Sequence, residues 1–102
     1  MASRLAVTGL LTLLSAIPAL ADDSKRLEHM VQQDCGSCHG LTMKGGLGKP
    51  LTREALAEVD PQIIASIILD GVPGTAMPPW RPLLGESEAL WIANYLKKGT
   101  LQ

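Results

Sequence analysis

The stretch Cys35-Gly36-Ser37-Cys38-His39 decides the fold of this chain. It is the C-x-x-C-H pattern that attaches a c-type haem. Two thiols three residues apart in a helical turn can reach both vinyl groups on one edge of a porphyrin, and the next residue can place an imidazole under the iron. We therefore expect Cys35 and Cys38 to bind one haem c covalently, with His39 as the proximal iron ligand.

Residues 1–21 are expected to be a cleavable secretory signal peptide. Arg4 supplies the positive n-region, residues 5–17 form an apolar h-region, and Ala19-Leu20-Ala21 fits the small-x-small rule at a cleavage site. A membrane anchor is the alternative, but the apolar stretch is short for a bilayer span and Pro18 lies near its end. We expect an exported protein without a membrane anchor after cleavage, whose mature chain is residues 22–102.

The mature chain is long enough for one small domain. A core of this size usually needs a cross-link or a cofactor to stabilise it. The sequence contains no Phe, and its aromatic residues are Trp80, Trp91 and Tyr95. A disulfide between the two cysteines would close only a tiny loop and would stabilise the fold little. We therefore expect a porphyrin to fill the middle of the domain.

The charge balance limits the classes of partner. The sequence contains ten acidic and nine basic residues, and the formal net charge is −1. No basic run is present, so nucleic acid is excluded as a partner. A mildly acidic surface with a few lysines suits transient docking to other redox proteins, one as electron donor and one as acceptor.

The order of helix signals and loops along the sequence predicts an all-α fold of about four short helices and two haem-wrapping loops. The first helix is expected over residues 22–34, with Ser24 as its N-cap. Leu27, Met30 and Val31 recur at helical spacing and should pack on the last helix.

Two helices are expected in the middle of the chain. Thr52 is an N-cap candidate for a short helix over residues 53–58. Asp60-Pro61 is a start signal for the next helix, and Gly71 is its stop signal. The isoleucines between them are β-branched and could also form a strand, but the start, the stop and the i, i+4 repeat favour a helix.

The last helix is expected over residues 86–98, between Gly85 and Gly99. Its apolar stripe consists of Ala89, Ile92, Ala93 and Leu96. Trp91 and Tyr95 form an i, i+4 pair beside this stripe.

The two loops have different compositions. Residues 40–51 contain four glycines and should wrap the haem edge on the His39 side, with Leu41, Leu47 and Leu51 facing the ring. Residues 71–85 contain four prolines, which make that loop stiff. A stiff loop can hold one side chain at a fixed point, and we expect that side chain to be Met77.

The iron needs a sixth ligand from its other face. His29 and Met30 are tied by short chain segments to the proximal side, and Met43 follows His39 too closely to cross the ring. Met77, beyond two helices, is therefore the expected distal ligand. A thioether ligand fills the site and raises the reduction potential, which favours electron transfer over catalysis.

Two residues after Met77 have an open role. Trp80 and Arg81 carry N–H groups that could reach a haem propionate. Trp80 could equally pack in the core while Arg81 is solvated. His29 is expected to be an ordinary surface residue.

These features together resemble the class I cytochromes c, and within them the NirC-type cytochromes of denitrification gene clusters. The closer resemblance covers nearly the whole mature chain. It is carried by Asp34-Cys35-Gly36-Ser37-Cys38-His39-Gly40-Leu41-Thr42, Lys44-Gly45-Gly46-Leu47-Gly48 and Pro73-Gly74-Thr75-Ala76-Met77-Pro78-Pro79-Trp80-Arg81-Pro82-Leu83-Leu84.

This resemblance implies a fold in which the N- and C-terminal helices cross beside one haem. It implies a periplasmic single-electron carrier, not an enzyme, which passes electrons toward a nitrite reductase carrying haem c and haem d. A role in maturing haem d is the alternative within the family, and a general periplasmic cytochrome is a further one. The protein is expected to be a monomer, although a domain-swapped dimer stays open.

One position departs from the family pattern. Class I cytochromes usually have Pro directly after the glycine that corresponds to Gly48, and the carbonyl of that Pro accepts the proximal imidazole N–H. Here Lys49 follows Gly48, and Pro50 comes next. Any residue offers a carbonyl, and Pro50 biases Lys49 toward an extended conformation, so the bond to His39 can persist.

Other protein classes use similar motifs. A thiol–disulfide oxidoreductase also carries C-x-x-C-H, but its fold needs strands before the motif, and none are predicted. A papain-like protease needs an aromatic residue at position 39 and a longer chain. A copper protein could use Cys, His and Met, but it leaves the C-x-x-C-H spacing unexplained. A zinc ribbon needs a second cysteine pair.

Overall fold

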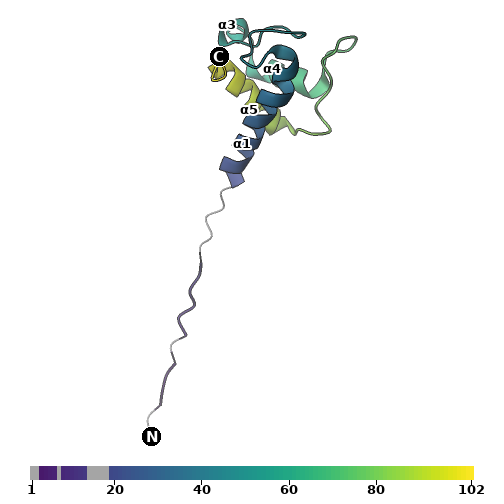
Figure 1. Ribbon diagram of the computed structural model, residues 1–102. Helices are drawn as coiled ribbons and strands as arrows, with labels where there is room; N and C mark the ends of the chain where they lie inside the picture. Colours follow the sequence, from purple (N-terminus) through teal and green to yellow (C-terminus); the bar gives the residue numbers. More distant parts are fainter. Residues whose placement is uncertain (1–2, 7, 14–18) are drawn as a thin grey trace.

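The computed structural model describes residues 3–6, 8–13 and 19–102 (Figure 1). Residues 3–6 and 8–13 are neither helix nor strand, and part of the expected signal peptide, including Pro18, lies outside the described residues. The described ranges contain helices and no strand, which confirms the all-α prediction. Among them, no helix is both long and apolar enough to cross a membrane.

Three helical segments follow one another without a break at the start of the fold. They are α1 (Ala19–Met30), the π-helix η1 (Val31–Cys35) and α2 (Gly36–His39). The prediction that this helix starts at residue 22 with Ser24 as its N-cap is wrong, because Ser24 lies inside α1. Ala and Leu are the best helix formers, and Ala19-Leu20-Ala21 extends the helix toward the N-terminus.

The π-helix is an unpredicted feature of this segment. The N–H of Gly36 donates to the carbonyl of Val31, five residues earlier. The hydrogen bond therefore encloses one residue more than in an α-helix. Short π-helical turns inside α-helices are rare and are often found at functional sites. This turn ends at Cys35 and leads directly into α2, which carries Cys38 and His39.

The next helix, α3 (Arg53–Leu56), is one turn long. Thr52 Oγ1 accepts a hydrogen bond of 3.2 Å from the Ala55 N–H, which confirms the predicted N-cap. The helix ends two residues before the predicted end at residue 58. Its last carbonyl, that of Leu56, and the carbonyls of Ala57 and Val59 accept hydrogen bonds from Lys97.

Helix α4 (Pro61–Asp70) begins and ends as predicted, and the alternative of a strand is excluded. The Asp60 side chain accepts a hydrogen bond of 2.7 Å from the Gln62 N–H, and Pro61 needs no partner in the first turn. Gly71 follows with φ +66°, a backbone conformation that favours glycine.

Helix α5 (Glu86–Lys98) also has its predicted bounds. The Gly85 N–H donates to Glu88 Oε1 at 3.0 Å, and Gly99 ends the helix in the left-handed conformation, at φ +71°. The Trp91 and Tyr95 rings are stacked, with their centroids 5.0 Å apart.

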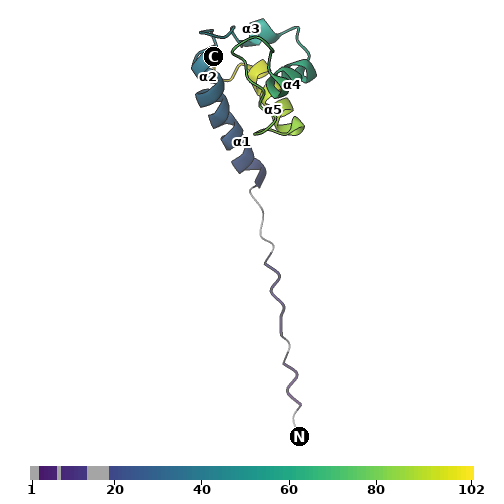
Figure 2. The same cartoon turned by 90° about the vertical axis from the view of Figure 1, so that its right-hand side faces the viewer.

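The core lies between α4, α5 and the first helical segment, and Figure 2 shows α1 on one side of the fold with α4 and α5 on the other. The predicted packing of α1 on α5 is confirmed: Leu27 and Val31 are buried and belong to the same cluster as the α5 stripe. The buried apolar residues are Leu27, Val31, Met43, Leu56, Ile64, Ala65, Ile68, Leu69, Leu84, Ala89, Ile92, Ala93, Tyr95 and Leu96.

Candidate haem site

The two cysteines lie at the junction of η1 and α2. Cys35 is the last residue of η1 and Cys38 belongs to α2; both are half-buried, and neither forms a disulfide. Between them, Ser37 Oγ donates to the Asp34 carbonyl at 2.8 Å and ties down this turn. The arrangement places two reduced thiols one helical turn apart.

The environment of Cys35 makes its thiol a poor nucleophile. Burial, followed by the negative charge of Asp34, raises the pKa of Cys35 to about 11. Thiol–disulfide oxidoreductases depend on the opposite shift, because the thiolate is the reactive form. The surroundings of Cys35 therefore disfavour the oxidoreductase alternative.

His39, the last residue of α2, has a fixed ring. Its Nδ1–H donates to the Lys49 carbonyl at 2.7 Å. The bond expected despite the Lys49-Pro50 departure is therefore present. A carbonyl can only accept, so this bond selects the tautomer of the neutral imidazole that has its lone pair on Nε2, which is the atom that would bind a metal.

The glycine loop packs closely against this histidine. Gly48 N–H donates to the Cys38 carbonyl at 2.8 Å, and Gly45 N–H donates to the His39 carbonyl at 2.8 Å. A Cβ at position 48 would lie 2.6 Å from His39 Cε1 and 2.7 Å from Nδ1. Only glycine allows the loop to lie this close to the imidazole.

Met77 is half-buried in the loop between α4 and α5, residues 71–85, which we call the Met77 loop. The other candidates for the sixth ligand are placed differently. Met43 is in the core, with 2% of its surface exposed, Met30 packs against the core, and His29 is exposed on α1.

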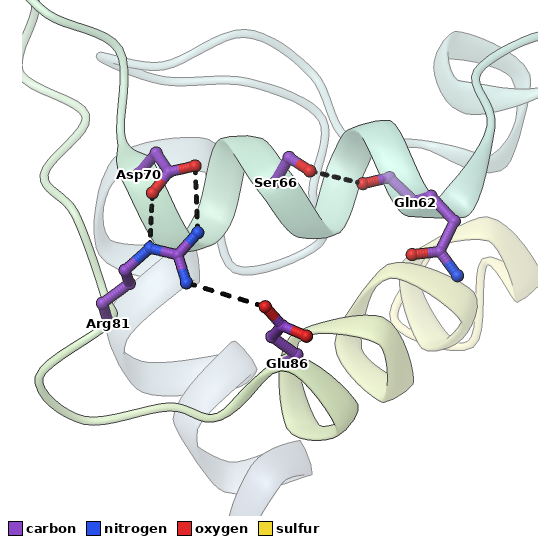
Figure 3. A network of polar contacts seen from close by, with 5 residues as sticks. All are labelled: Gln62, Ser66, Asp70, Arg81 and Glu86. Carbon is purple, nitrogen blue, oxygen red and sulfur yellow. Dashed lines mark hydrogen bonds and ion pairs between the residues drawn. The ribbon is translucent and has the colours of Figure 1, made fainter.

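Trp80 and Arg81 differ in their surroundings. Trp80 is half-buried and packs against the core. The Arg81 guanidinium donates to both carboxylate oxygens of Asp70, at 2.5 and 3.2 Å, and Glu86 lies 4.0 Å away (Figure 3). Arg81 is thus not simply solvated, and its charge is already paired within the protein.

Several apolar side chains are covered only in part by the protein. Ile64 and Ile68 on α4 are buried, yet Ile63 and Ile67 on the same helix are 55% and 43% exposed. In the glycine loop, Leu41 and Leu47 are 71% and 80% exposed, whereas Leu51, also expected at the ring, packs against the core.

These residues fit a covalent haem. The chain offers two free thiols one turn apart, an imidazole with a free Nε2, a half-buried thioether and exposed apolar side chains. A flat apolar ring is the kind of group that such side chains would cover.

Comparison with known proteins agrees with this chemistry. Residues 22–96 match the family model described as cytochrome C oxidase, cbb3-type, subunit III. The chain belongs to this family of c-type cytochromes. It therefore carries covalently bound haem c with its iron, and it is an electron-transfer protein and not an enzyme.

Individual relatives are more informative about the subgroup. Cytochrome c55X of Paracoccus denitrificans (strain Pd 1222) is 53% identical, over 94% of this chain and 95% of the relative. Cytochrome c55X of Stutzerimonas stutzeri is 48% identical, over 84% of this chain and 75% of the relative. The solved structure of the c-type cytochrome NirC is 43% identical, with a TM-score of 0.76, over 79% of this chain and 95% of that one. This cytochrome is thus an electron carrier related to NirC of denitrification.

A larger protein contains a similar part. One such solved structure is dihydro-heme d1 dehydrogenase NirN in complex with DHE. Its sequence is 33% identical to this chain over 69% of the chain, and the TM-score is 0.63. The match covers 15% of that protein, so the likeness concerns one small part of it.

Proposed function

We propose that Cys35 and Cys38 hold one haem c by thioether bonds and that His39 and Met77 are its axial iron ligands. The observation that carries this assignment is the His39 ring, which Lys49 and Gly48 fix with Nε2 free, directly after the two thiols. Met77 is the candidate for the sixth ligand because Met43 is enclosed in the core, and His29 and Met30 lie on the helix that leads into the thiols.

The residues of the chain set how the site works. The Lys49 carbonyl orients the imidazole and raises its basicity through the Nδ1–H bond. The bound haem supplies single-electron chemistry, which a thioether ligand shifts toward higher potential. With His39 and Met77 on the two faces, no position is left for a substrate, which suits a carrier.

We further propose that this cytochrome is exported to the periplasm with removal of residues 1–21, and that it acts as a monomer. There it donates electrons to a nitrite reductase that carries haem c and haem d. The support is the similarity to NirC and to the relatives named cytochrome c55X.

A second candidate role is as an electron carrier that assists haem d maturation. Its support is the 33% identity to dihydro-heme d1 dehydrogenase. A chain that resembles one part of that enzyme could exchange electrons with it. If neither protein exchanges electrons with this cytochrome, the role of a general periplasmic carrier remains.

The docking surface is proposed to surround the haem edge, at residues 40–48 and 74–82. In the first of these segments Leu41 and Leu47 are exposed apolar side chains, and Lys44 is an exposed charge. Electron-transfer interfaces are small and short-lived, so one charge should affect the rate measurably.

The test is stopped-flow mixing of the reduced holoprotein with oxidised nitrite reductase. We expect Lys44→Glu to lower the second-order rate constant by several fold at low salt and to leave the haem spectrum unchanged. Lys98→Glu, at an exposed site at the end of α5, is the matched control and should have little effect. If the two variants lower the rate constant equally, the docking surface is not at residues 40–48. No transfer by the wild type would remove nitrite reductase as the partner, and the same assay with the dehydrogenase tests the second role.

A further inference from the structure

The Met77 loop leaves the C-terminus of α4 at Gly71 and returns to it at Trp80 and Arg81, before it leads into α5. The last carbonyls of a helix have no partner within the helix. Here two of them accept N–H groups from the part of the loop that follows Met77: Ile68 from Trp80 at 3.0 Å and Leu69 from Arg81 at 3.2 Å. The chain therefore leaves α4, passes through Met77 and returns to the same helix end.

Within the loop, the Met77 backbone is held on both sides. Its N–H donates to Thr75 Oγ1 at 3.2 Å, and its carbonyl accepts from the Val72 N–H at 3.2 Å. The Met77 carbonyl also passes so close to Gly71 that a Cβ there would lie 2.8 Å from it. The local turn thus fixes the peptide of Met77. The position of the whole turn depends on the base of the loop, where Trp80 and Arg81 bind the end of α4.

One side-chain pair closes that base. Arg81, in the segment of the loop that returns to α4, donates through Nε and Nη2 to the two carboxylate oxygens of Asp70, the last residue of α4. Its Nη1 lies 4.0 Å from Glu86, the first residue of α5 (Figure 3). A two-point guanidinium–carboxylate contact restricts orientation as well as distance.

We propose that the Arg81–Asp70 pair is a clamp that closes the Met77 loop and so sets how readily Met77 leaves the iron. Arg81 and Asp70 are then positioning residues that act through Met77. This proposal rests on Met77 being the sixth ligand. It gives the charge of Arg81 a role other than binding a propionate.

The test measures the displacement of Met77 by imidazole in the oxidised holoprotein. The variants are Asp70→Asn, Arg81→Gln and the double variant. The observable is the imidazole concentration at which half of the sulfur-to-iron charge-transfer band is lost. Because the pair is partly exposed, we expect each single variant to lower this concentration about two- to fivefold. The double variant should do no more than either single one, because the two residues act as one unit.

Two controls separate the clamp from general effects. Arg53→Gln removes the same charge from an arginine whose Nε lies 3.8 Å from Glu54 on its own helix, and it should leave the imidazole concentration unchanged. Lys97→Met removes three hydrogen bonds at the other end of α5 from Glu86, and it should lower stability without changing the imidazole concentration.

The possible failures are distinct. A wild-type protein without the charge-transfer band would overturn the ligand assignment itself. A wild type with the band, and clamp variants that match Arg53→Gln, would overturn the clamp alone. Amide exchange at Trp80 and Arg81 gives an independent reading, because opening of the loop base should speed exchange at both N–H groups.

Discussion

Two neighbouring residues position the His39 imidazole. Lys49 supplies only its carbonyl, so its side chain is irrelevant to the bond with His39, and the absence of the usual proline has no effect on it. Gly48 acts through what it lacks, because any side chain would enter the space of the ring. At this scale the backbone of the loop does the positioning.

Substitution of Gly48 tests this point. In Gly48→Ala the new methyl group would lie 2.6 Å from His39 Cε1, so either the ring or the loop must move. We expect a loss of stability of about 1–3 kcal/mol, together with an altered haem spectrum. Denaturant unfolding of the holoprotein, followed by haem absorbance and by circular dichroism, measures both effects.

Gly85→Ala is the comparison variant for this experiment. A Cβ at Gly85 meets nothing closer than Glu88 Oε1 at 3.6 Å, and the cost there is that of a poorer N-cap. It should lower stability and leave the haem spectrum as in the wild type. If Gly48→Ala behaves in the same way, the imidazole is not held by the close approach of the loop.

Among the elements, α3 depends on a lysine from α5. Lys97 Nζ donates to the carbonyls of Leu56, Ala57 and Val59, at 2.7, 3.2 and 2.5 Å. A helix of one turn cannot be stable by itself, because helix formation has a costly nucleus. The ammonium group therefore binds the last carbonyl of α3 and two carbonyls of the turn that follows, and so joins this part of the chain to α5.

Replacing Lys97 with Met keeps the aliphatic length and removes the three hydrogen bonds. We expect Lys97→Met to lower the free energy of unfolding by about 1–2 kcal/mol. Lys98→Met, at the adjacent exposed position, should change it little. Urea unfolding of the three proteins is the measurement, and similar losses in both variants would mean that charge, and not the carbonyl contacts, is responsible.

The start of α5 makes a pH-dependent contribution to stability. The hydrogen bond from the Gly85 N–H, followed by the bond from Arg26 of α1, holds the pKa of Glu88 below its usual range. A carboxyl whose pKa is lower in the folded state stabilises the fold above its ordinary pKa. That contribution is lost as the pH falls through the lowered value.

Glu88→Gln should therefore lower the urea midpoint at pH 7, and the difference from the wild type should shrink at about pH 3. Glu58→Gln, which removes the same charge at an exposed site in the loop after α3, is the control. A difference that stays constant between the two pH values would contradict the role of the Glu88 charge.

Local signals explain which elements could be predicted from the sequence. The ends of α4 and α5 depend on residues directly beside them in the sequence: Asp60-Pro61 and Gly71 for α4, and Gly85 and Gly99 for α5. The predicted bounds of both helices are confirmed. The π-helix η1 has no such signal, because its wider turn depends on what the helix packs against.

Long-range side-chain contacts explain what sequence patterns missed. The Lys97 contact with Leu56 joins residues 41 apart, and the Arg81–Asp70 pair joins residues 11 apart. No helical periodicity or capping rule predicts such contacts. For the candidate site, the C-x-x-C-H motif predicts the roles of the two thiols and the imidazole, and these roles stay a prediction, whereas the closeness of Gly48 to the ring is visible only in the structure.

For the molecule as a whole, several large apolar side chains lie outside the core. Ile63, Ile67, Leu41 and Leu47 are exposed in the protein alone, and no Phe contributes to the core. Such exposed apolar side chains usually mark a binding site. Here they agree with a family whose haem is part of the folded molecule, so cofactor binding and stability should be coupled.

The two axial ligands then determine what the whole molecule can do. If both positions are filled by His39 and Met77, the protein exchanges electrons and does not bind small molecules at the iron. If Met77 is not bound, gas binding or catalysis becomes possible at the same site. The role as a carrier therefore depends most directly on the ligand from the Met77 loop.

The measurement that tests this most directly is the absorption spectrum of the exported protein in three states: oxidised, reduced, and reduced under carbon monoxide. We predict a c-type haem spectrum, a sulfur-to-iron charge-transfer band in the oxidised form and no change on addition of carbon monoxide. A haem that binds carbon monoxide readily, without the charge-transfer band, would contradict ligation by Met77 and the role as a closed electron carrier.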